Sequence, residues 1–206
     1  MFAPDCSQHF DAKKEYNMND NLAYQEKWRE ELIGGKLVAM APAATNHNRV
    51  KLNITGLFWM YLDGRSCEVL PDGEGLFLSE EDEYIPDVMI VCDPDKIHPD
   101  GVHGAPDLVV EILSPGTARY DRGRKKDIYE KNGVREYWIV EPDSKAVEQW
   151  QLMEGRFILQ NVYSIYPEYM LARMKASERA AVPAEFKCSL YDDLTFRLAD
   201  IFKRVP

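Results

Sequence analysis

The segment 106–113, which reads PDLVVEIL, constrains the fold of this chain more than any other stretch. Its apolar residues, 108–110 and 112–113, are typical of a strand buried on both faces of a sheet. Glu111 stands in the middle of this run, and burying an unpaired carboxylate is costly. The fold must therefore supply Glu111 with a proton, a cation or a metal ion.

Helices and strands alternate along the rest of the chain. Apolar residues at Val50, Ile54, Leu57, Phe58 and Tyr61 predict an amphipathic helix that begins near Thr45 and ends near Gly64. A second helix is expected over 118–133, closed by Asn132-Gly133. A hairpin around Gly34-Gly35 is expected at 30–42. Further strands are expected at 67–71, 75–79, 84–92, 106–113, 135–142, 146–152 and 156–163.

The ends of the chain are less regular. Residues 1–20 are polar and resemble a loose lead-in, and a short helix is expected at about 21–30. Segment 164–185 has a helical composition, and the closing LTFRLADIF is expected to pack on the core. The order of elements predicts a mixed α/β fold with a central mixed β-sheet flanked by helices. The length of 206 residues suggests a single domain, 1–206.

Charge is distributed unevenly along the chain. The net charge is −10, and residues 68–100 alone hold eleven acids against one base. Residues 119–135 hold seven bases and three acids, which favours a local basic approach to an acidic centre. The overall charge argues against a protein that coats nucleic acid without specificity.

Other features favour a cytoplasmic protein. No apolar run approaches the roughly 20 residues that span a bilayer, and no export signal begins the chain. We therefore expect no membrane partner. The four cysteines are scattered without a CxxC pair, which predicts reduced thiols rather than disulfides or a zinc site.

Two Pro-Asp pairs, 86–87 and 106–107, each precede a predicted strand. If these strands pair antiparallel, Asp87 lies beside Glu111. Asp107 shares a face with Glu111 but is four residues away, roughly 13 Å along a strand. Asp107 is therefore expected to act as a cap or turn residue, and Asp87 is the better partner. Two carboxylates so close share a proton or bind a hard cation.

A lysine completes this set. Asp121, Lys125 and Tyr129 recur at i, i+4 and i+8, which places them on one face of the predicted helix. Two acids with Mg²⁺ or Mn²⁺ and a lysine are a minimal set for phosphodiester cleavage, with Lys125 as the base or as a stabiliser of charge. The simpler alternatives are that Glu111 pairs with an arginine and that Lys125 is a solvated surface residue, with Lys126 as its rival.

The segments YIPDVMIV and GAPDLVVEILSPGTARYDRGRKKDIYEKNGVREYWIVEP, with REELIGGKLVAMAP upstream, resemble a family of restriction endonucleases in the PD-(D/E)XK superfamily. The resemblance implies a restriction-endonuclease-like core. It makes Asp87 the motif aspartate and Glu111 the acid of the E-x-K element. Leu113 stands where the superfamily has lysine, and Lys125 fits the position to which this family is thought to have moved it.

The resemblance also implies supporting residues. The main-chain carbonyl of Ile112 would be a further metal ligand, and Glu31 would support the metal through water. His47 is judged from its position alone: at the start of the first long helix it is expected to cap the helix, with contact to substrate as the alternative. Gly116 and Gly34 depart from the residues that the family tends to have, serine and aspartate, and neither replaces a proposed ligand.

Three functions follow as hypotheses. The first is a Mg²⁺- or Mn²⁺-dependent endonuclease acting on DNA, with a homodimer placing two sites on opposite strands. The second is a nuclease-fold protein that no longer cuts and serves as a binding or regulatory module. The third is a carboxylate-pair hydrolase acting on another substrate such as a glycoside, and the lysine argues against it.

Overall fold

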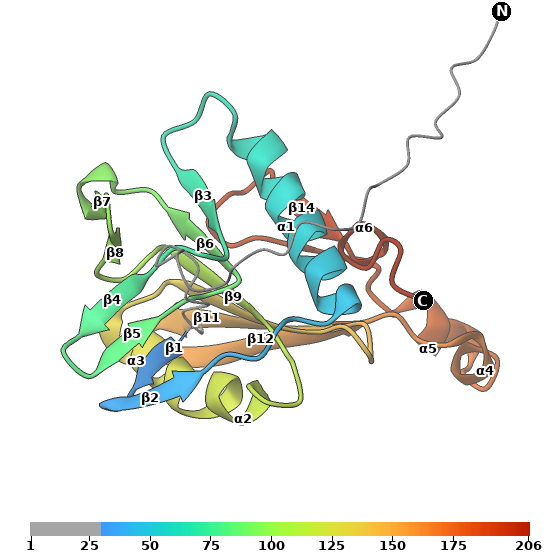
Figure 1. Cartoon of the computed structure of the whole chain (residues 1–206). Coiled ribbons are helices and arrows are strands. Elements are labelled where there is room, and N and C mark those ends of the chain that lie inside the picture. Colours follow the sequence, from blue (N-terminus) through green and yellow to red (C-terminus); the bar gives the residue numbers. More distant parts are fainter. Residues whose placement is uncertain (1–29) are drawn as a thin grey trace, which may run out of the picture.

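The computed structural model describes residues 30–206 (Figure 1). The predicted lead-in at 1–20 and the predicted helix at 21–30 lie outside the described residues, apart from Glu30, which begins the first strand. The remaining elements can be compared with the sequence one by one.

The main sheet has six strands in the order β12-β11-β10-β9-β6-β3. Only β9 and β10 run parallel, and every other neighbouring pair is antiparallel. The predicted central mixed sheet is confirmed. Its strands are β3 (Glu68–Pro71), β6 (Val88–Val91), β9 (Leu108–Ile112), β10 (Glu136–Glu141), β11 (Ala146–Met153) and β12 (Arg156–Ser164).

A second six-stranded sheet, which the sequence did not predict as a separate unit, has the order β2-β1-β5-β4-β8-β7. The strand expected at 84–92 is in fact two strands, β5 and β6, in different sheets. Pro86 lies between them, where a residue without an N–H donor interrupts a ladder at little cost. The second sheet consists of β1 (Glu30–Ile33), β2 (Lys36–Ala39), β4 (Leu76–Ser79), β5 (Asp82–Tyr84), β7 (Ile97–His98) and β8 (Gly101–His103).

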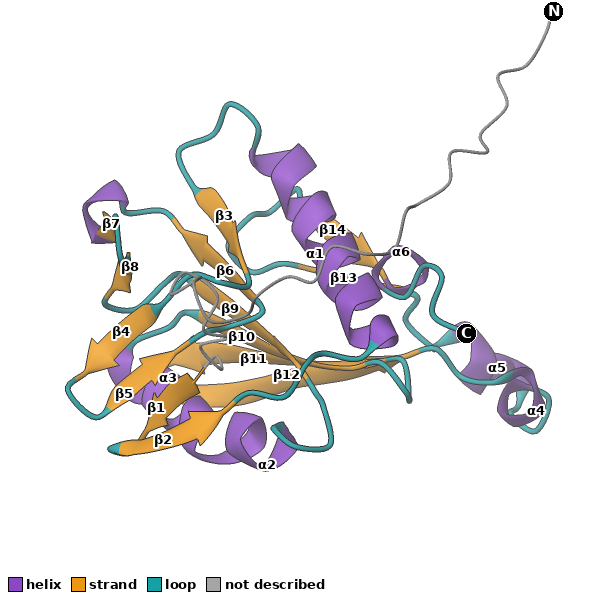
Figure 2. Ribbon diagram, viewed as in Figure 1, coloured by secondary structure: helices purple, strands orange, loops and turns teal. Residues whose placement is uncertain are grey.

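Helix α1 (Thr45–Leu62) forms where the apolar spacing predicts it, and it buries Val50, Ile54 and Phe58. It covers one face of the main sheet together with α6 (Leu198–Ile201) and the hairpin of β13 (Glu185–Lys187) and β14 (Thr195–Arg197) (Figures 1 and 2). The predicted packing of the C-terminal segment is confirmed, because Leu198 and Phe202 are buried in this core.

The opposite face of the main sheet packs against the second sheet and α3 (Lys126–Asn132). The helix predicted over 118–133 is irregular: α2 (Ala118–Tyr120) leads into a π-helical turn at Asp121–Lys125, which continues into α3. Gly123 has a non-helical backbone within that turn, and Gly133 ends α3 with φ 87° as expected.

Segment 164–185 forms two short helices, α4 (Glu168–Leu171) and α5 (Ala176–Ala180), which agrees with its helical composition. Figure 1 shows both helices projecting from the body of the molecule. One further short element, a 3-10 turn at Pro94–Lys96, lies between β6 and β7.

The expectation of reduced thiols is wrong for two of the cysteines, because Cys67 and Cys92 form a disulfide. Strands β3 and β6 pair antiparallel with Glu68 opposite Val91, so the residues just outside the ladder face one another across the strand ends. A search of the sequence for CxxC pairs cannot find this proximity. Within residues 30–206, no helix has the length and apolar content that crossing a membrane requires.

Candidate active site

The site is built around the antiparallel pair of β6 and β9. Their register places Val88 opposite Val110, so Asp87 and Glu111 occupy the next position along, as the sequence predicted. Asp87 lies just outside β6, and its Oδ2 accepts a hydrogen bond from the Ile112 main-chain nitrogen at 2.8 Å. Asp87 therefore closes the end of the ladder beside Glu111.

Asp107 has the equivalent position at the other end of the same strand pair. Its Oδ2 accepts a hydrogen bond from the main-chain nitrogen of Cys92 at 2.8 Å, and its Oδ1 lies 3.2 Å from Nη1 of the exposed Arg135. The two Pro-Asp pairs thus perform the same backbone role, and only one of them adjoins Glu111.

Lys125 is the cation that the buried Glu111 requires. Its side chain is only 2% exposed, and its Nζ lies 2.8 Å from Glu31 Oε1, 3.1 Å from Glu111 Oε1 and 3.5 Å from Asp121 Oδ1. Asp121 and Lys125 sit at the two ends of the π-helical turn. The turn brings both side chains toward the sheet.

The charge of Lys125 is held firmly. Desolvation alone would lower the pKa of Lys125, but the carboxylates of Glu111, Glu31 and Asp121 outweigh it and raise that pKa above its ordinary value. A lysine that stays protonated cannot accept a proton as a general base. Of the two roles expected for Lys125, the three ion pairs therefore favour stabilisation of charge.

The ionised form of Glu111 is disfavoured in this environment even with Lys125 beside it. Its Oε1 accepts hydrogen bonds from Lys125 and from the Tyr129 hydroxyl at 2.7 Å. Burial raises the pKa of Glu111 well above its ordinary value, and the charges of Asp121, Glu31 and Asp87 raise it further, opposed by Lys125. Three buried acids share one lysine, so the cluster lacks positive charge.

Glu31 and Asp121 are both buried within this cluster. Glu31 Oε1 also accepts a hydrogen bond from the main-chain nitrogen of Ile85, which fixes its carboxylate between the two sheets. Burial raises the pKa of Asp121, and its Oδ1 has no hydrogen bond from any described residue. Sequence reasoning placed Glu31 through family resemblance alone, and the structure brings it to Lys125.

His47 and Lys51 approach the cluster from α1. His47 Nε2 lies 3.2 Å from Asp87 Oδ2, and its Nδ1 is buried without a partner among the described residues. Lys51 Nζ lies 2.7 Å from Asp72 and 3.9 Å from Asp87 Oδ1. Sequence reasoning missed Lys51, although its i+4 spacing from His47 places the two on the same side of the helix.

Lys126, the rival of Lys125, is elsewhere. Its Nζ lies 4.0 Å from the centroid of the Trp150 ring, in a cation–π contact. The two adjacent lysines thus point in different directions, one into the acidic cluster and one onto an aromatic ring.

A cavity of about 320 Å³ adjoins His47 and the C-terminal end of β9. It is bounded by the start of α1, the turn after β9 and the end of β10. Its lining residues include His47, Leu113, Ser114, Pro115, Glu141 and Pro142. His47 both lines this cavity and contacts Asp87, so the cavity adjoins the Asp87 side of the site.

The carboxylates at the site suit a hard divalent cation. Among described residues, no hydrogen bond falls on Oε2 of Glu111 or Oδ1 of Asp87, so each acid keeps an oxygen for a ligand bond. No group of three or more His, Cys, Asp and Glu side chains in residues 30–206 is placed to enclose a metal. Mg²⁺ is commonly held by one or two carboxylates with water, which fits this pair.

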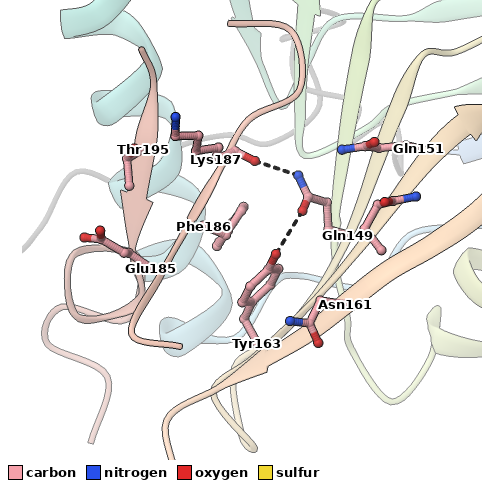
Figure 3. Close-up of a pocket in the computed structure, with 9 residues that line it drawn as sticks. Gln149, Gln151, Asn161, Tyr163, Glu185, Phe186, Lys187 and Thr195 are labelled. Carbon is pink, nitrogen blue, oxygen red and sulfur yellow. Dashed lines mark hydrogen bonds between the residues drawn. The ribbon is translucent and has the colours of Figure 1, made fainter. Parts of the chain in front are cut away.

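A larger cavity, about 510 Å³, lies beside β11, β12 and the β13–β14 hairpin, on the face of the main sheet opposite the Lys125 cluster (Figure 3). Gln149 of β11 is at its floor, donating to the Lys187 carbonyl and accepting from the Tyr163 hydroxyl. Gln149 also donates to Glu136, a fully buried acid that receives further hydrogen bonds from Trp138 and Ser189. These hydrogen bonds hold Glu136 in place, and no ion pair to it forms among residues 30–206.

Comparisons with known proteins identify the family and the fold. Residues 18–174 match the Uma2 family, described as "Putative restriction endonuclease". "Uncharacterized protein slr1290" of Synechocystis sp. is 33% identical over 131 residues, which are 62% of this chain and 69% of that protein. "Uncharacterized protein sll1609" of the same organism is 27% identical over 132 residues, 62% of this chain and 75% of that protein.

A solved structure shares the fold. The crystal structure of a putative nuclease belonging to DUF820 from Anabaena variabilis superposes with a TM-score of 0.58. The match covers 84% of this chain and 89% of that one, at 17% sequence identity. The restriction-endonuclease-like fold expected from the sequence is confirmed.

Proposed function

The chain belongs to the Uma2 family of putative restriction endonucleases, and we propose that it is a Mg²⁺- or Mn²⁺-dependent endonuclease that hydrolyses phosphodiester bonds in DNA. The observation that carries the proposal is the buried cluster of Lys125 with Glu31, Glu111 and Asp121 beside Asp87. A protein gains no folding stability from placing three acids around one lysine in its interior, which favours a functional role.

Asp87, Glu111 and the main-chain carbonyl of Ile112 would hold the divalent cation. When bound, such a cation lowers the pKa of a coordinated water and offsets charge on a phosphate. The residues on the chain prepare this site in advance. Ile112 N fixes the Asp87 carboxylate, and Tyr129 fixes the Glu111 carboxylate.

Lys125 would stabilise negative charge that develops on the phosphate. Its carboxylate partners keep the ammonium protonated, and its buried side chain is fixed by these ion pairs. A cation fixed in a dry site acts more strongly on developing charge than one in water. Glu31 and Asp121 are positioning residues, because they hold the Lys125 ammonium in place.

His47 would contact the substrate from the cavity side. It is held 3.2 Å from Asp87, and it lines the cavity of about 320 Å³. Lys51 lies on the same side of Asp87 at 3.9 Å and supplies positive charge toward an incoming phosphate.

The test is cleavage of supercoiled plasmid and of single-stranded DNA with Mn²⁺, with Mg²⁺ or with EDTA. We expect cutting that requires the metal and that falls about a thousandfold in Asp87→Ala. Asp107→Ala is the matched control, because Asp107 makes the same kind of bond to the neighbouring strand and stands away from the cluster. Equal activity of the two variants would contradict the proposal.

Isothermal titration with Mn²⁺ separates the remaining outcomes. If no form cuts but the parent binds Mn²⁺ and Asp87→Ala does not, the metal site is intact and the substrate is a different one. If no form cuts and none binds Mn²⁺, the chain is a nuclease-fold binding or regulatory module. The lack of a three-ligand enclosure within residues 30–206 is the observation that favours this second candidate.

A further inference from the structure

Lys51 lies between two aspartates at the edge of the candidate site. Its Nζ is 2.7 Å from Asp72 Oδ2 and 3.9 Å from Asp87 Oδ1. The first distance is that of a charge-assisted hydrogen bond, and the second is too long for one. Lys51 is therefore bound to Asp72 and only adjacent to Asp87.

The pairing of β3 with β6 brings the two aspartates together. The ladder of these strands ends with Pro71 opposite Val88. The next position along places Asp72 opposite Asp87. Asp72 begins the connection from β3 to β4, and α1 packs beside both strands (Figure 1). Lys51 extends from that helix and reaches both carboxylates.

The two oxygens of Asp87 have different surroundings. Oδ2 accepts a hydrogen bond from the Ile112 main-chain nitrogen at 2.8 Å and lies 3.2 Å from His47 Nε2. Oδ1 accepts no hydrogen bond from residues 30–206, and the Lys51 ammonium lies 3.9 Å from it. Oδ1 is thus the oxygen that a metal ion would use, and Lys51 is the group placed to occupy it instead.

An ammonium and a divalent cation compete for one carboxylate oxygen, because like charges a few ångströms apart repel each other. The flexible four-carbon stem of a lysine lets an ammonium without its own partner turn to another nearby acid. For Lys51, that acid is Asp87. The side chains of Lys51 and Asp72 are only 16% and 20% exposed, so solvent weakens their ion pair less than it weakens a surface pair.

We propose that Asp72 is a positioning residue that holds Lys51 away from Asp87 and so keeps Oδ1 of Asp87 open to a metal ion, a role that rests on the proposed metal-dependent function. Asp72 balances the charge of the ammonium, and the charge of Asp87 stays available to the metal. Neither strand composition nor the family resemblance gave Asp72 a role. Two facing aspartates that share one lysine have this division of labour as their consequence.

Isothermal titration of the full chain with Mn²⁺ alone, without DNA, tests the proposal. Asp72→Asn should weaken Mn²⁺ binding about tenfold, because the released Lys51 pairs with Asp87 and competes with the metal. Lys51→Met should change the affinity less than about threefold, since Lys51 is already held off Asp87 in the parent. The double variant D72N/K51M should bind Mn²⁺ about as tightly as Lys51→Met alone, because the competing ammonium is gone.

Glu74→Gln is the matched control. It removes one negative charge from the same connection between β3 and β4, and Glu74 is exposed and makes no ion pair with Lys51. Glu74→Gln should keep the Mn²⁺ affinity of the parent. Circular dichroism checks that every variant is folded. A purely structural loss in Asp72→Asn would not be reversed by the removal of Lys51.

Three results would overturn the role of Asp72 and leave the proposed function standing. They are a parent affinity in Asp72→Asn, an equal loss in Glu74→Gln, and a D72N/K51M variant that stays as weak as Asp72→Asn. The last result would mean that Asp72 acts on the metal directly and not through Lys51. A parent that binds no Mn²⁺, or that binds it equally well after Asp87→Ala, would contradict the proposed metal site itself and the role of Asp72 with it.

Discussion

The two ends of the β6–β9 strand pair begin from the same local sequence and differ in everything around it. At each end the aspartate of a Pro-Asp pair accepts a hydrogen bond from a main-chain N–H of the other strand: Asp87 accepts from Ile112, and Asp107 accepts from Cys92. The Asp107 end adjoins a disulfide and an exposed arginine. The Asp87 end adjoins a buried cluster of acids around Lys125.

The difference extends to the buried glutamates. Glu136, on β10, is completely buried and is held by neutral donors from Trp138, Gln149 and Ser189. Glu111, on β9, is also buried, but its pKa is raised and one of its oxygens is left without a described hydrogen bond. A buried carboxylate whose oxygens all accept hydrogen bonds is typical of the structural core. A buried carboxylate with a raised pKa and an oxygen without a hydrogen bond is typical of a functional site.

The largest expected effect separates the two aspartates. Asp87→Ala should lower metal-dependent cleavage about a thousandfold, because it removes a proposed metal ligand. Asp107→Ala should leave the cleavage rate close to that of the parent. Each variant should lower the free energy of unfolding by about 1–3 kcal/mol, because each leaves a main-chain N–H without its acceptor. Single-turnover cleavage with urea unfolding measures both quantities.

The second comparison uses the adjacent lysines. Lys125→Met should lower the free energy of unfolding by about 3–5 kcal/mol, because it leaves Glu31, Glu111 and Asp121 buried together without a cation. Lys126→Met should cost about 1 kcal/mol or less, since it loses only the contact with the Trp150 ring. Urea unfolding at pH 7 compares them, and equal losses would contradict the assignment of the buried cation.

The third comparison concerns the two glutamates. Glu136→Gln should lower the free energy of unfolding by about 2 kcal/mol, because an amide NH₂ would face donors on Trp138, Gln149 or Ser189. Glu111→Gln removes one of three acids around Lys125, so at pH 8 in EDTA we expect no loss of stability or a small gain. Thermal unfolding of both variants measures the contrast. A larger loss in Glu111→Gln would show that its charge stabilises the fold.

The smallest expected change, measured per pH unit, is the pH dependence that Glu111 gives to the stability of the fold. Because the pKa of Glu111 is raised in the folded state, the folded chain keeps a proton that the unfolded chain releases above about pH 4.5. The stability contributed by Glu111 therefore falls as pH rises above that value toward the folded pKa, by at most about 1.4 kcal/mol per pH unit. Urea unfolding of the parent and Glu111→Gln in EDTA from pH 5 to 8 should show this difference. Parallel profiles would contradict it.

Much of the architecture could be predicted from local sequence patterns. The apolar stripe of α1, the hairpin at Gly34-Gly35 and the cap at Gly133 formed where expected. The separate second sheet could not be predicted, because β5 and β6 are continuous in sequence and only long-range pairing assigns them to different sheets. The disulfide escaped prediction for the same reason, since register rather than spacing brings Cys67 to Cys92.

For the candidate site, the sequence by itself determined that Glu111 would lie in a buried strand, because strand composition is a local property. It placed Asp87 beside Glu111 only if the two strands paired antiparallel, and the tertiary structure supplies that pairing. The tertiary structure decided which cation reaches Glu111, that Glu31 joins from another sheet, and that Asp107 repeats the backbone role of Asp87 without its neighbours. These depend on contacts between residues far apart in the chain, and a charge in the interior takes its properties from those contacts.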